Sequence, residues 1–583
     1  MTGAVETAAP VRRTWARRLR ISAAPDPGRR MFVILLVLGW VLGVAWRFWL
    51  TRYTTMPIAH TDEDSYLNAA RAIAGGPGGF SSETVFNRRA GYPILISPAY
   101  LLGQDFFTTY HVVHLINAML NAAMLPLAYL LCRRMLALGR VPAFAAAVAA
   151  ATLPATVFYS GVAMIDSILA PLLIAWLLAV HAWLDGLDRL RLAILAGALA
   201  GAFYILHVRG LVIVGIHLAL ATLLALRKLI PWRAVLATSA PVAALAVVNR
   251  VVIDLLGDKV HLLGPSAGMH TIRAIGSPQG MGRVLAATGT QIWYLVVITF
   301  GLAGIGWALA LREIWRPSRG FAFRWTMGIA LTATLGVAFG SSVILAGSIG
   351  PSEAIYARYI QMLAPFWLLV GLAALLLATS RVAVRQAAFA LAVLIVGGVG
   401  VALRLWYVEH GGNRLRYGWF NAPELYVLTA GYREMRPLTG TFLAGGACVV
   451  LVLAVRVRSM RLPVIALLVL ANLFTMNLIV DRIVRPAIVR TMPTPRLVED
   501  IGVRPGERVA ASLGVYFVTR YNLSNEVTWV EVPWFRDVPP ADADVVLVRW
   551  APGEPDDWDG AKYGFVRLGG NVSQQWAAWR RIR

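Results

Sequence analysis

Apolar runs of about 20 residues recur along the whole chain, and they constrain its fold more than any other feature. A helix of about 20 apolar residues is long enough to cross the hydrocarbon core of a bilayer. The sequence therefore predicts an all-α polytopic membrane protein with about 13 transmembrane helices. The runs lie near 31–50, 110–131, 141–158, 163–183, 190–206, 210–226, 233–253, 290–311, 325–346, 359–379, 383–405, 438–456 and 461–480.

The composition excludes an ordinary soluble fold. The mean hydropathy is +0.65, and 58% of the 583 residues are hydrophobic against 14% that are charged. A soluble core cannot hide that much apolar surface. The first run, 31–50, is too long for the apolar part of a signal peptide and is not followed by a small-residue cleavage site, so we expect an uncleaved anchor.

The basic residues predict an orientation. The formal net charge is +24, and arginine clusters occur in every second connection, on the same side as the basic segment 1–30. By the positive-inside rule that side is cytoplasmic. We therefore expect a multi-pass protein of the plasma (inner) membrane with its N-terminus in the cytoplasm. No basic patch is interleaved with aromatic residues, so we expect no nucleic-acid partner.

The long connections fall on the other side of the membrane, which places function outside. They include residues 51–109 and 406–437 and everything after 480. From Asp481 the chain is polar, with the β-rich runs "RVAASL", "EVTWVEV", "ADVVLVRW" and "YGFVRLG" and the helix-like "YFVTRYNL". Such runs between Gly, Pro and Asp signals predict strands. We expect a transmembrane domain over 31–480 with the outer loop 51–109, and a small extracytoplasmic α/β domain over 481–583.

Three consecutive carboxylates, Asp62, Glu63 and Asp64, open the stretch "DEDSYLNAARAIAGG" in the first outer loop. Small and apolar residues then repeat at helical spacing, which predicts a short interfacial helix. Acidic residues at a helix N-terminus are favoured by the helix dipole, so capping is one interpretation. A catalytic role is the other. Arg88 and Arg89 follow in the same loop, and two arginines near carboxylates suit an anionic ligand.

Other charged residues lie at span ends on the same face of the membrane. Asp166 opens a span, Arg209 lies in the tight connection "LHVRG", and Arg358 and Tyr359 precede another span. Each has a plain explanation: a helix cap for Asp166, snorkelling for Arg209 and an interfacial anchor for Arg358 and Tyr359. Their collection on one face favours a shared site.

The string Asp62-Glu63-x-x-Tyr66, followed by Ala70-Arg71, resembles the first outer loop of the GT-C glycosyltransferases. It is most similar to the aminoarabinose transferase and protein O-mannosyltransferase group, in which the Asp serves as the catalytic base. "RRAGYPILISPAY" resembles a segment of that group, with Arg89 in the position of its lysine. "YSGVAMIDSILAP", "HVRGL" and "YARYIQMLAPF" are similar to its second outer loop, to an Arg-x-x-Gly-type turn and to a donor-holding segment.

The resemblance covers roughly residues 31–220 and 350–380 and implies a GT-C-like fold and a glycosyltransferase activity. A hexosyl or pentosyl group would pass from a polyprenyl-phosphate donor to a hydroxyl of a cell-envelope glycan, lipid or protein, with membrane lipid as a further partner. Asp62 would be the base, with Asp64 the alternative and Glu63 and Asp166 supporting acids. The donor phosphate would be held by Arg88, Arg89, Arg209, Arg358 and Tyr359.

Two further assignments accompany this mechanism. A divalent cation, Mg²⁺ or Mn²⁺, would bridge Glu63 or Asp64 to the phosphate, because both metals prefer oxygen ligands, and His60 would join a softer metal site. The long outer loop 406–437 carries Glu409 and His410 and is a candidate acceptor-binding loop.

The sequence leaves two alternative functions open. A secondary transporter or flippase of lipid-linked intermediates predicts charges in the middle of spans. Arg250 is the best such candidate, but most charges lie at span ends. A glycan polymerase or ligase with its site in loop 406–437 would make the acids of the first loop dispensable.

Overall fold

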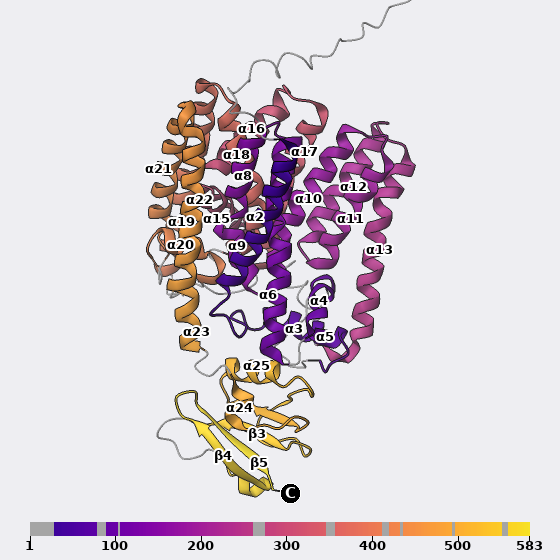
Figure 1. Cartoon of the computed structure of the whole chain (residues 1–583), viewed down its shortest axis with the longest axis vertical. Helices are drawn as coiled ribbons and strands as arrows, with labels where there is room; N and C mark the ends of the chain where they lie inside the picture. Colours follow the sequence, from indigo (N-terminus) through magenta and orange to yellow (C-terminus); the bar gives the residue numbers. More distant parts are fainter. Residues whose placement is uncertain are drawn as a thin grey trace, which may run out of the picture.

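The chain is described by a computed structural model over residues 28–78, 89–102, 105–260, 275–345, 356–410, 419–431, 435–491, 496–550 and 558–582. Figure 1 shows a bundle of long helices with a smaller sheet domain at one end. We call the end of the bundle that faces this domain the domain-side end. Arg88, which the sequence predicts as a phosphate ligand, lies outside the described residues.

Ten described helices are long and apolar enough to cross a membrane, judged by length and composition. Eight of them are built on α2 (Arg29–Leu50), α10 (Asp166–Asp185), α13 (Trp232–Leu256), α15 (Pro278–Ile298), α17 (Phe321–Leu345), α18 (Ala364–Leu377), α19 (Ser380–His410) and α21 (Pro437–Arg456). The other two are α6 (Phe106–Ala122) with α7 (Met124–Arg134), and α22 (Arg461–Ile479) with the π-helical η9 (Val480–Val484) and α23 (Arg485–Thr491).

Three more predicted spans are present in a shorter or broken form. α8 (Arg140–Ala151) continues into α9 (Pro154–Val157) and the 3₁₀ turn η2 (Phe158–Gly161) with a bend of 54°. Pro154 lacks the amide hydrogen that would continue α8, which explains the break. The other two are α11 (Leu190–Leu206) and α12 (Gly210–Leu226), each of 17 residues.

The predicted span over 290–311 is wrong. α15 begins earlier, at Pro278, and ends at Ile298, and a separate helix α16 (Leu302–Trp315) follows. Between them Phe300 and Gly301 have φ angles of 51° and 82°. A Cβ on Gly301 would lie 2.6 Å from Sγ of Cys448, so close packing against α21 also requires glycine here. This turn is invisible in the hydropathy pattern because all its residues are small or apolar.

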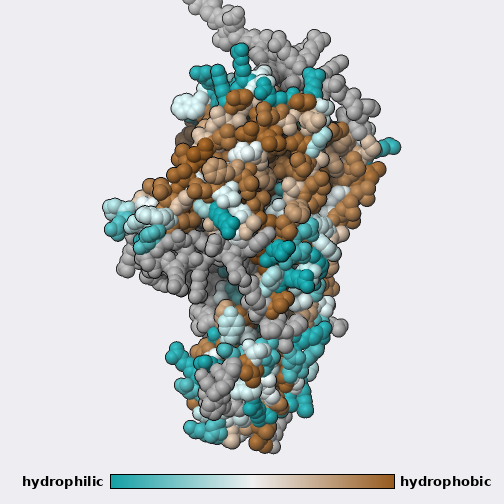
Figure 2. Space-filling model, turned by 90° about the vertical axis from the view of Figure 1, so that its left-hand side faces the viewer, coloured by the Kyte–Doolittle hydropathy of each residue, from teal (hydrophilic) through white to brown (hydrophobic). Residues whose placement is uncertain are grey.

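The surface of the bundle is suited to lipid. Figure 2 shows an apolar belt over the bundle, with hydrophilic residues above it and on the sheet domain below. Large apolar side chains on α2, α19, α21 and α22 are exposed, among them Leu42, Val396, Phe442 and Leu467. Exposed apolar surface of this extent marks a membrane-facing region. The all-α polytopic architecture with a small C-terminal sheet domain is therefore confirmed.

The C-terminal domain is a five-stranded mixed sheet in the order β2-β1-β3-β5-β4. Its strands are β1 (Val509–Ser512), β2 (Trp534–Phe535), β3 (Val545–Arg549), β4 (Phe565–Asn571) and β5 (Trp576–Arg581). β1 pairs in parallel with β2 and β3, with Val509 opposite Val545, while β5 runs antiparallel to β3 and β4. The helices α24 (Leu497–Ile501) and α25 (Phe517–Glu526) complete the domain.

Three of the four predicted strands and the predicted helix are present, whereas "EVTWVEV" is not a strand. Part of the reason is that its backbone is engaged elsewhere: Val527 donates to the Leu523 carbonyl of α25, and the Val527 carbonyl accepts from Arg71. β5, which the sequence did not predict, supplies the antiparallel partner of β3 instead.

The two parts of the chain pack directly against each other. α22, η9 and α23 continue past the predicted domain boundary at 480 to Thr491. α25 then lies between the sheet and the bundle, where it contacts α6 and the short helix α3 (Asp62–Ile73), and its Val518 belongs to the apolar core of the bundle. The helices α4 (Gly91–Ile96) and α5 (Pro98–Leu102) lie at the same end of the bundle (Figure 1).

Candidate functional site

The three carboxylates that open α3 lie in different environments. The side chain of Asp62 is 41% exposed, whereas Glu63 and Asp64 are 0% and 1% exposed. Only Asp62 is therefore accessible to a substrate from solvent or from the membrane interface.

Glu63 joins the loop that follows α2 to the loop that precedes α10. Its Oε1 accepts from the backbone amides of Ile58 and Ala59, both at 2.8 Å. Its Oε2 accepts from the Tyr110 hydroxyl at 2.6 Å and from the Ala163 amide at 2.7 Å. Burial raises the pKa of Glu63, although the hydrogen bonds act in the opposite direction. Glu63 thus has a structural role that sequence alone did not reveal.

Asp64 joins α3 to the C-terminal domain. Its Oδ2 accepts from the Thr61 amide at 2.9 Å and pairs with His60 Nδ1 at 3.0 Å. Its Oδ1 accepts from Asn525 Nδ2 of α25 at 2.8 Å. Burial lowers the pKa of His60, but the charge of Asp64 and the hydrogen bond to it outweigh burial, and the net direction is upward. Glu63 and Asp64 form what we call the anchor region.

Four charged side chains form a chain of ion pairs, which we call the ion-pair network. Asp62 Oδ2 accepts from Arg358 Nη1 at 2.8 Å. Arg358 Nε lies 3.9 Å from Asp166 Oδ2, and Asp166 Oδ1 accepts from Arg209 Nη2 at 2.8 Å. The structure therefore brings together four of the residues that the sequence predicts for the site, from segments up to 296 positions apart.

Local backbone geometry places each member of this network. Asp166 is the first residue of α10, where the helix dipole favours a carboxylate. Arg209 precedes Gly210 in the turn between α11 and α12, where a Cβ on Gly210 would lie 2.0 Å from the Phe203 carbonyl oxygen. Only glycine permits so tight a turn. Arg358 lies in the 3₁₀ turn η5 (Ala357–Tyr359), just before α18.

Aromatic rings line the arginines of the network. The guanidinium carbon of Arg209 lies 4.3 Å from the ring centre of Tyr359, and that of Arg358 lies 5.3 Å from the same ring. Rings of Tyr356 and Phe420 also lie within 6 Å of Arg358. Such cation–π contacts orient a guanidinium without consuming its hydrogen-bond donors. The predicted residue Tyr359 thus contacts both arginines of the ion-pair network.

His207 is a member of the site that the sequence analysis missed. Its Nδ1 accepts from the backbone amide of Arg209 at 3.0 Å and from its Nε at 3.2 Å. Burial lowers the pKa of His207 well below the ordinary value, and the charges of Arg209, Arg358 and Arg89 lower it further. A neutral imidazole can accept these bonds. The signal was present in "HVRG", where the histidine stands two residues before the arginine.

The arginines keep unused donors. Within the described ranges, Nη1 of Arg209 and Nε of Arg358 and Arg89 are buried and have no hydrogen-bond partner. Oδ2 of Asp166 is likewise buried without a hydrogen bond. Arg89 stacks on the Tyr204 ring at 4.1 Å. Buried donors without partners are rare in proteins, and a cluster of them around two carboxylates points to an anion that completes the site.

The predicted acceptor loop is only partly described. His410 is exposed at the end of α19, and its Nδ1 contacts the Trp406 carbonyl oxygen at 2.9 Å. The side chain of Glu409 lies outside the described part. A different carboxylate of this loop, Glu424 of α20 (Pro423–Leu428), is buried and accepts from Tyr294 at 2.7 Å. Burial raises the pKa of Glu424 to about 7.

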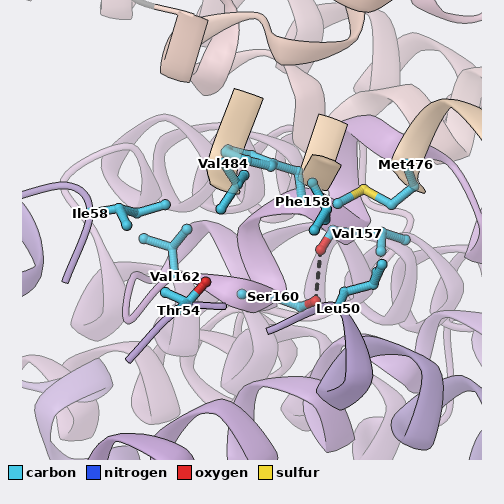
Figure 3. A pocket seen from close by; sticks show the side chains of 11 residues that line it. Leu50, Thr54, Ile58, Val157, Phe158, Ser160, Val162, Met476 and Val484 are labelled. Atoms are coloured by element: carbon cyan, nitrogen blue, oxygen red, sulfur yellow. Dashed lines mark hydrogen bonds between the residues drawn. The ribbon is translucent and has the colours of Figure 1, made fainter. Parts of the chain in front are cut away.

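An apolar pocket lies beside the loop that follows α2, between the end of α2, the α9–η2 segment and the α22–η9 segment (Figure 3). Its walls include Phe158 and Met476, and its hydroxyl groups come from Thr54 and Ser160. Ser160 Oγ donates to the Val157 carbonyl at 2.7 Å. Because none of the described residues that line it is ionisable, we assign the chemistry to the ion-pair network.

The predicted metal ligands do not fit a cation in this geometry. Both oxygens of Glu63 and both of Asp64 already accept hydrogen bonds, and His60 Nδ1 faces Asp64. Among the residues that the structure describes, no three His, Cys, Asp or Glu side chains form a group that could hold a metal ion.

Comparison with known proteins identifies the fold. Neither a protein-family model nor a curated protein sequence matches the chain. ArnT from Cupriavidus metallidurans bound to undecaprenyl phosphate is similar in structure, with a TM-score of 0.51 and 14% identity over 95% of this chain and 99% of ArnT. Apo ArnT gives a TM-score of 0.49 at 14% identity, covering 95% of this chain and 98% of that one.

The arabinosyltransferase EmbB from Mycobacterium smegmatis gives a TM-score of 0.40 at 14% identity, over 96% of this chain and 47% of EmbB. At such identities structural likeness concerns the fold alone. The match to undecaprenyl-phosphate-bound ArnT covers almost all of both chains, helical bundle and C-terminal domain together. The resemblance expected from residues 51–109 is thus confirmed for the fold: this chain has the GT-C fold of ArnT.

Proposed function

We propose that this protein is a membrane glycosyltransferase that moves a sugar from a polyprenyl-phosphate donor to an acceptor hydroxyl on the outer face of the membrane. The observation that carries the proposal is the ion-pair network with its unused donors. It combines one accessible carboxylate, Asp62, with buried guanidinium nitrogens of Arg89, Arg209 and Arg358 that have no hydrogen-bond partner among the described residues.

The charges of the site favour a phosphate-bearing donor. Asp62 and Asp166 balance Arg358 and Arg209, and Arg89 adds a third positive charge within electrostatic reach of His207. When the bond from the anomeric carbon to the phosphate oxygen breaks, the polyprenyl phosphate leaves with one more negative charge. Positioned guanidinium groups stabilise that charge as it develops. The likeness in fold to an ArnT structure with bound undecaprenyl phosphate supports the same donor class.

Asp62 is the carboxylate best placed to accept the proton. One oxygen binds Arg358, and the side chain is 41% exposed, so an acceptor hydroxyl can approach it. The hydroxyl oxygen attacks the anomeric carbon while its proton passes to Asp62, and the donor phosphate departs toward the arginines. A positioned general base of this kind contributes about 10² to 10⁴ in rate. Asp64, the alternative base, is buried and bonded to three donors.

The test is transfer of labelled sugar from a mixed pool of polyprenyl-phosphate sugars, with wild type and Asp62→Asn compared. We expect the variant to lose at least about 100-fold in kcat while it still binds donor. Asp481→Asn is the matched control, because Asp481 is a half-exposed carboxylate paired with Arg52 at the same end of the bundle. Normal transfer by Asp62→Asn would exclude Asp62 as the base and favour a site in loop 406–437.

A further inference from the structure

We propose that Asn525 of the C-terminal domain is a positioning residue for Asp62 and acts through Asp64. The proposal rests on the role of Asp62 in the proposed function. It makes the C-terminal domain a part of the active site, because one helix of that domain fixes the geometry of the loop that carries the base.

The turn before Asp62 is strained and needs to be held. Thr61 has φ 74° and ψ −53°, a combination that L residues rarely adopt and that is least favourable for a β-branched one. A backbone of this kind costs roughly 1–3 kcal/mol and persists only where its surroundings enforce it. Because Asp62 directly follows Thr61, the conformation of this turn sets the direction in which the Asp62 side chain points away from the backbone.

Asp64 is the group that enforces the turn. One of its oxygens accepts from the Thr61 amide at 2.9 Å and also pairs with His60 at 3.0 Å, so both residues before Asp62 are bound to a single carboxylate oxygen. Rotation of that carboxylate would break both contacts together.

Asn525 prevents that rotation. Its Nδ2 donates to the other oxygen of Asp64 at 2.8 Å, and the side chains of both residues are buried. Asp64 and Asn525 are 461 positions apart, so the contact exists only when the C-terminal domain is docked. The path from the domain to the base is therefore Asn525, Asp64, Thr61 and Asp62.

The same helix, α25, also holds the far end of α3. Arg71 Nη1 donates to the carbonyls of Ser524 and Val527 at 3.0 and 3.2 Å. Near the start of α3, the His60 ring stacks on Tyr521 with 5.5 Å between ring centres. α3 is thus bound at both ends to residues 521–527, which makes it a rigid support for Asp62.

An exchange of the two partners tests the proposal in the full-length chain. Asn525→Asp places two carboxylates face to face, and we expect kcat to fall about 100-fold, the cost of a misplaced group. The double variant Asp64→Asn/Asn525→Asp lets the amide at position 64 donate to the carboxylate at position 525. We expect it to recover most of the lost kcat. The donor KM should stay unchanged in both, because neither change touches the arginines.

The control is Glu526→Gln, one position along α25. Glu526 accepts from the amides of Leu497 and Val498 inside the C-terminal domain and has no hydrogen bond to α3. Glu526→Gln should leave kcat as in wild type. This control separates loss of positioning by Asn525 from general damage to the C-terminal domain. An unchanged kcat in Asn525→Asp, or a double variant as slow as the single one, would overturn the proposal.

Hydrogen exchange over residues 58–73 gives a readout that does not depend on activity. Asn525→Asp should speed exchange in this segment, and the double variant should restore the wild-type rate. If no donor is turned over by wild type, the proposed function fails, yet the exchange pattern still decides whether Asn525 holds the loop. Unchanged exchange in Asn525→Asp would show that it does not.

Discussion

Asp62 and Glu63 are neighbours in the chain, but they belong to regions of opposite character. In the ion-pair network around Asp62, single guanidinium nitrogens have no hydrogen-bond partner among the described residues, and the carboxylate is accessible. In the anchor region, every oxygen of Glu63 and Asp64 accepts a hydrogen bond and both side chains are buried. Buried polar atoms without hydrogen-bond partners mark a place where a ligand binds, whereas fully bonded carboxylates stabilise the fold itself.

This comparison predicts that substitutions in the two regions affect different properties of the protein. Changes in the network should reduce transfer and leave the fold intact. Changes in the anchor region should reduce stability first and affect transfer through the position of Asp62.

Glu63→Ala should give the largest effect on stability. It leaves three backbone amides and the Tyr110 hydroxyl without their acceptor, in a buried place that water does not easily reach. Each unsatisfied group costs about 1–3 kcal/mol, so we expect a loss of about 3 kcal/mol or more in the free energy of unfolding. Thermal unfolding in detergent, followed by tryptophan fluorescence, measures it.

The control for Glu63→Ala is Asp62→Ala, next to it in the chain, which removes an exposed carboxylate and should shift the melting temperature much less. Equal shifts for the two variants would contradict the division between the regions.

Arg358→Lys should give the largest effect on donor use without loss of the fold. Lysine keeps the charge but loses the planar fork that contacts Asp62 and also faces Asp166. A lost hydrogen bond to a charged group costs about 1.5–3 kcal/mol, so kcat/KM for the donor should fall roughly 10- to 100-fold. The control Arg52→Lys, at the exposed pair with Asp481, should leave kcat/KM for the donor unchanged. If both variants lost kcat/KM equally, the effect would come from surface charge in general and not from the ion-pair network.

The sequence predicted the ion-pair network better than the anchor region, for a physical reason. Asp166, Arg209 and Arg358 each stand at the end of an apolar run, and a charge there is visible in the hydropathy pattern. Spans were predictable for the same reason, because crossing a membrane requires length and apolarity. The break at Phe300 and Gly301 was missed because it depends on packing against Cys448, which the pattern does not contain.

The three acids of α3 could not be told apart from sequence. Their environments depend on the strained turn at Thr61, on Tyr110 and on Asn525, which is 461 positions from Asp64. A neutral partner such as Asn525 carries no signal of charge or spacing. Long-range hydrogen bonds decide which carboxylate is free, and these require the folded chain.

His60, which pairs with Asp64 of the anchor region, makes a smaller and pH-dependent contribution to stability. Its pKa is raised in the folded chain: burial opposes the charge, but Asp64 outweighs burial and Glu63 adds to it. A raised pKa means that the stabilisation is fully present below the unfolded value of about 6.5 and is lost as the pH rises through the folded value.

The measurement is the melting temperature of wild type and of His60→Asn between pH 5.5 and pH 9. The advantage of wild type should be greatest at low pH and should shrink as the pH rises. An advantage that grows with pH would show that His60 is neutral in the fold and that its pair with Asp64 is an ordinary hydrogen bond.

Removal of divalent cations by a chelator should have the smallest effect on sugar transfer. The sequence predicts a divalent cation at Glu63, Asp64 and His60, but the hydrogen bonds of the anchor region occupy the oxygens that would bind it. A cation there would have to displace backbone amides and release the strained turn at Thr61. We therefore expect transfer to be unchanged by EDTA, with added Mg²⁺ or Mn²⁺ as the control. Activity lost to EDTA and restored by Mg²⁺ would contradict this expectation and would show that a metal takes part, bound at Asp62 or by residues outside the described part of the chain.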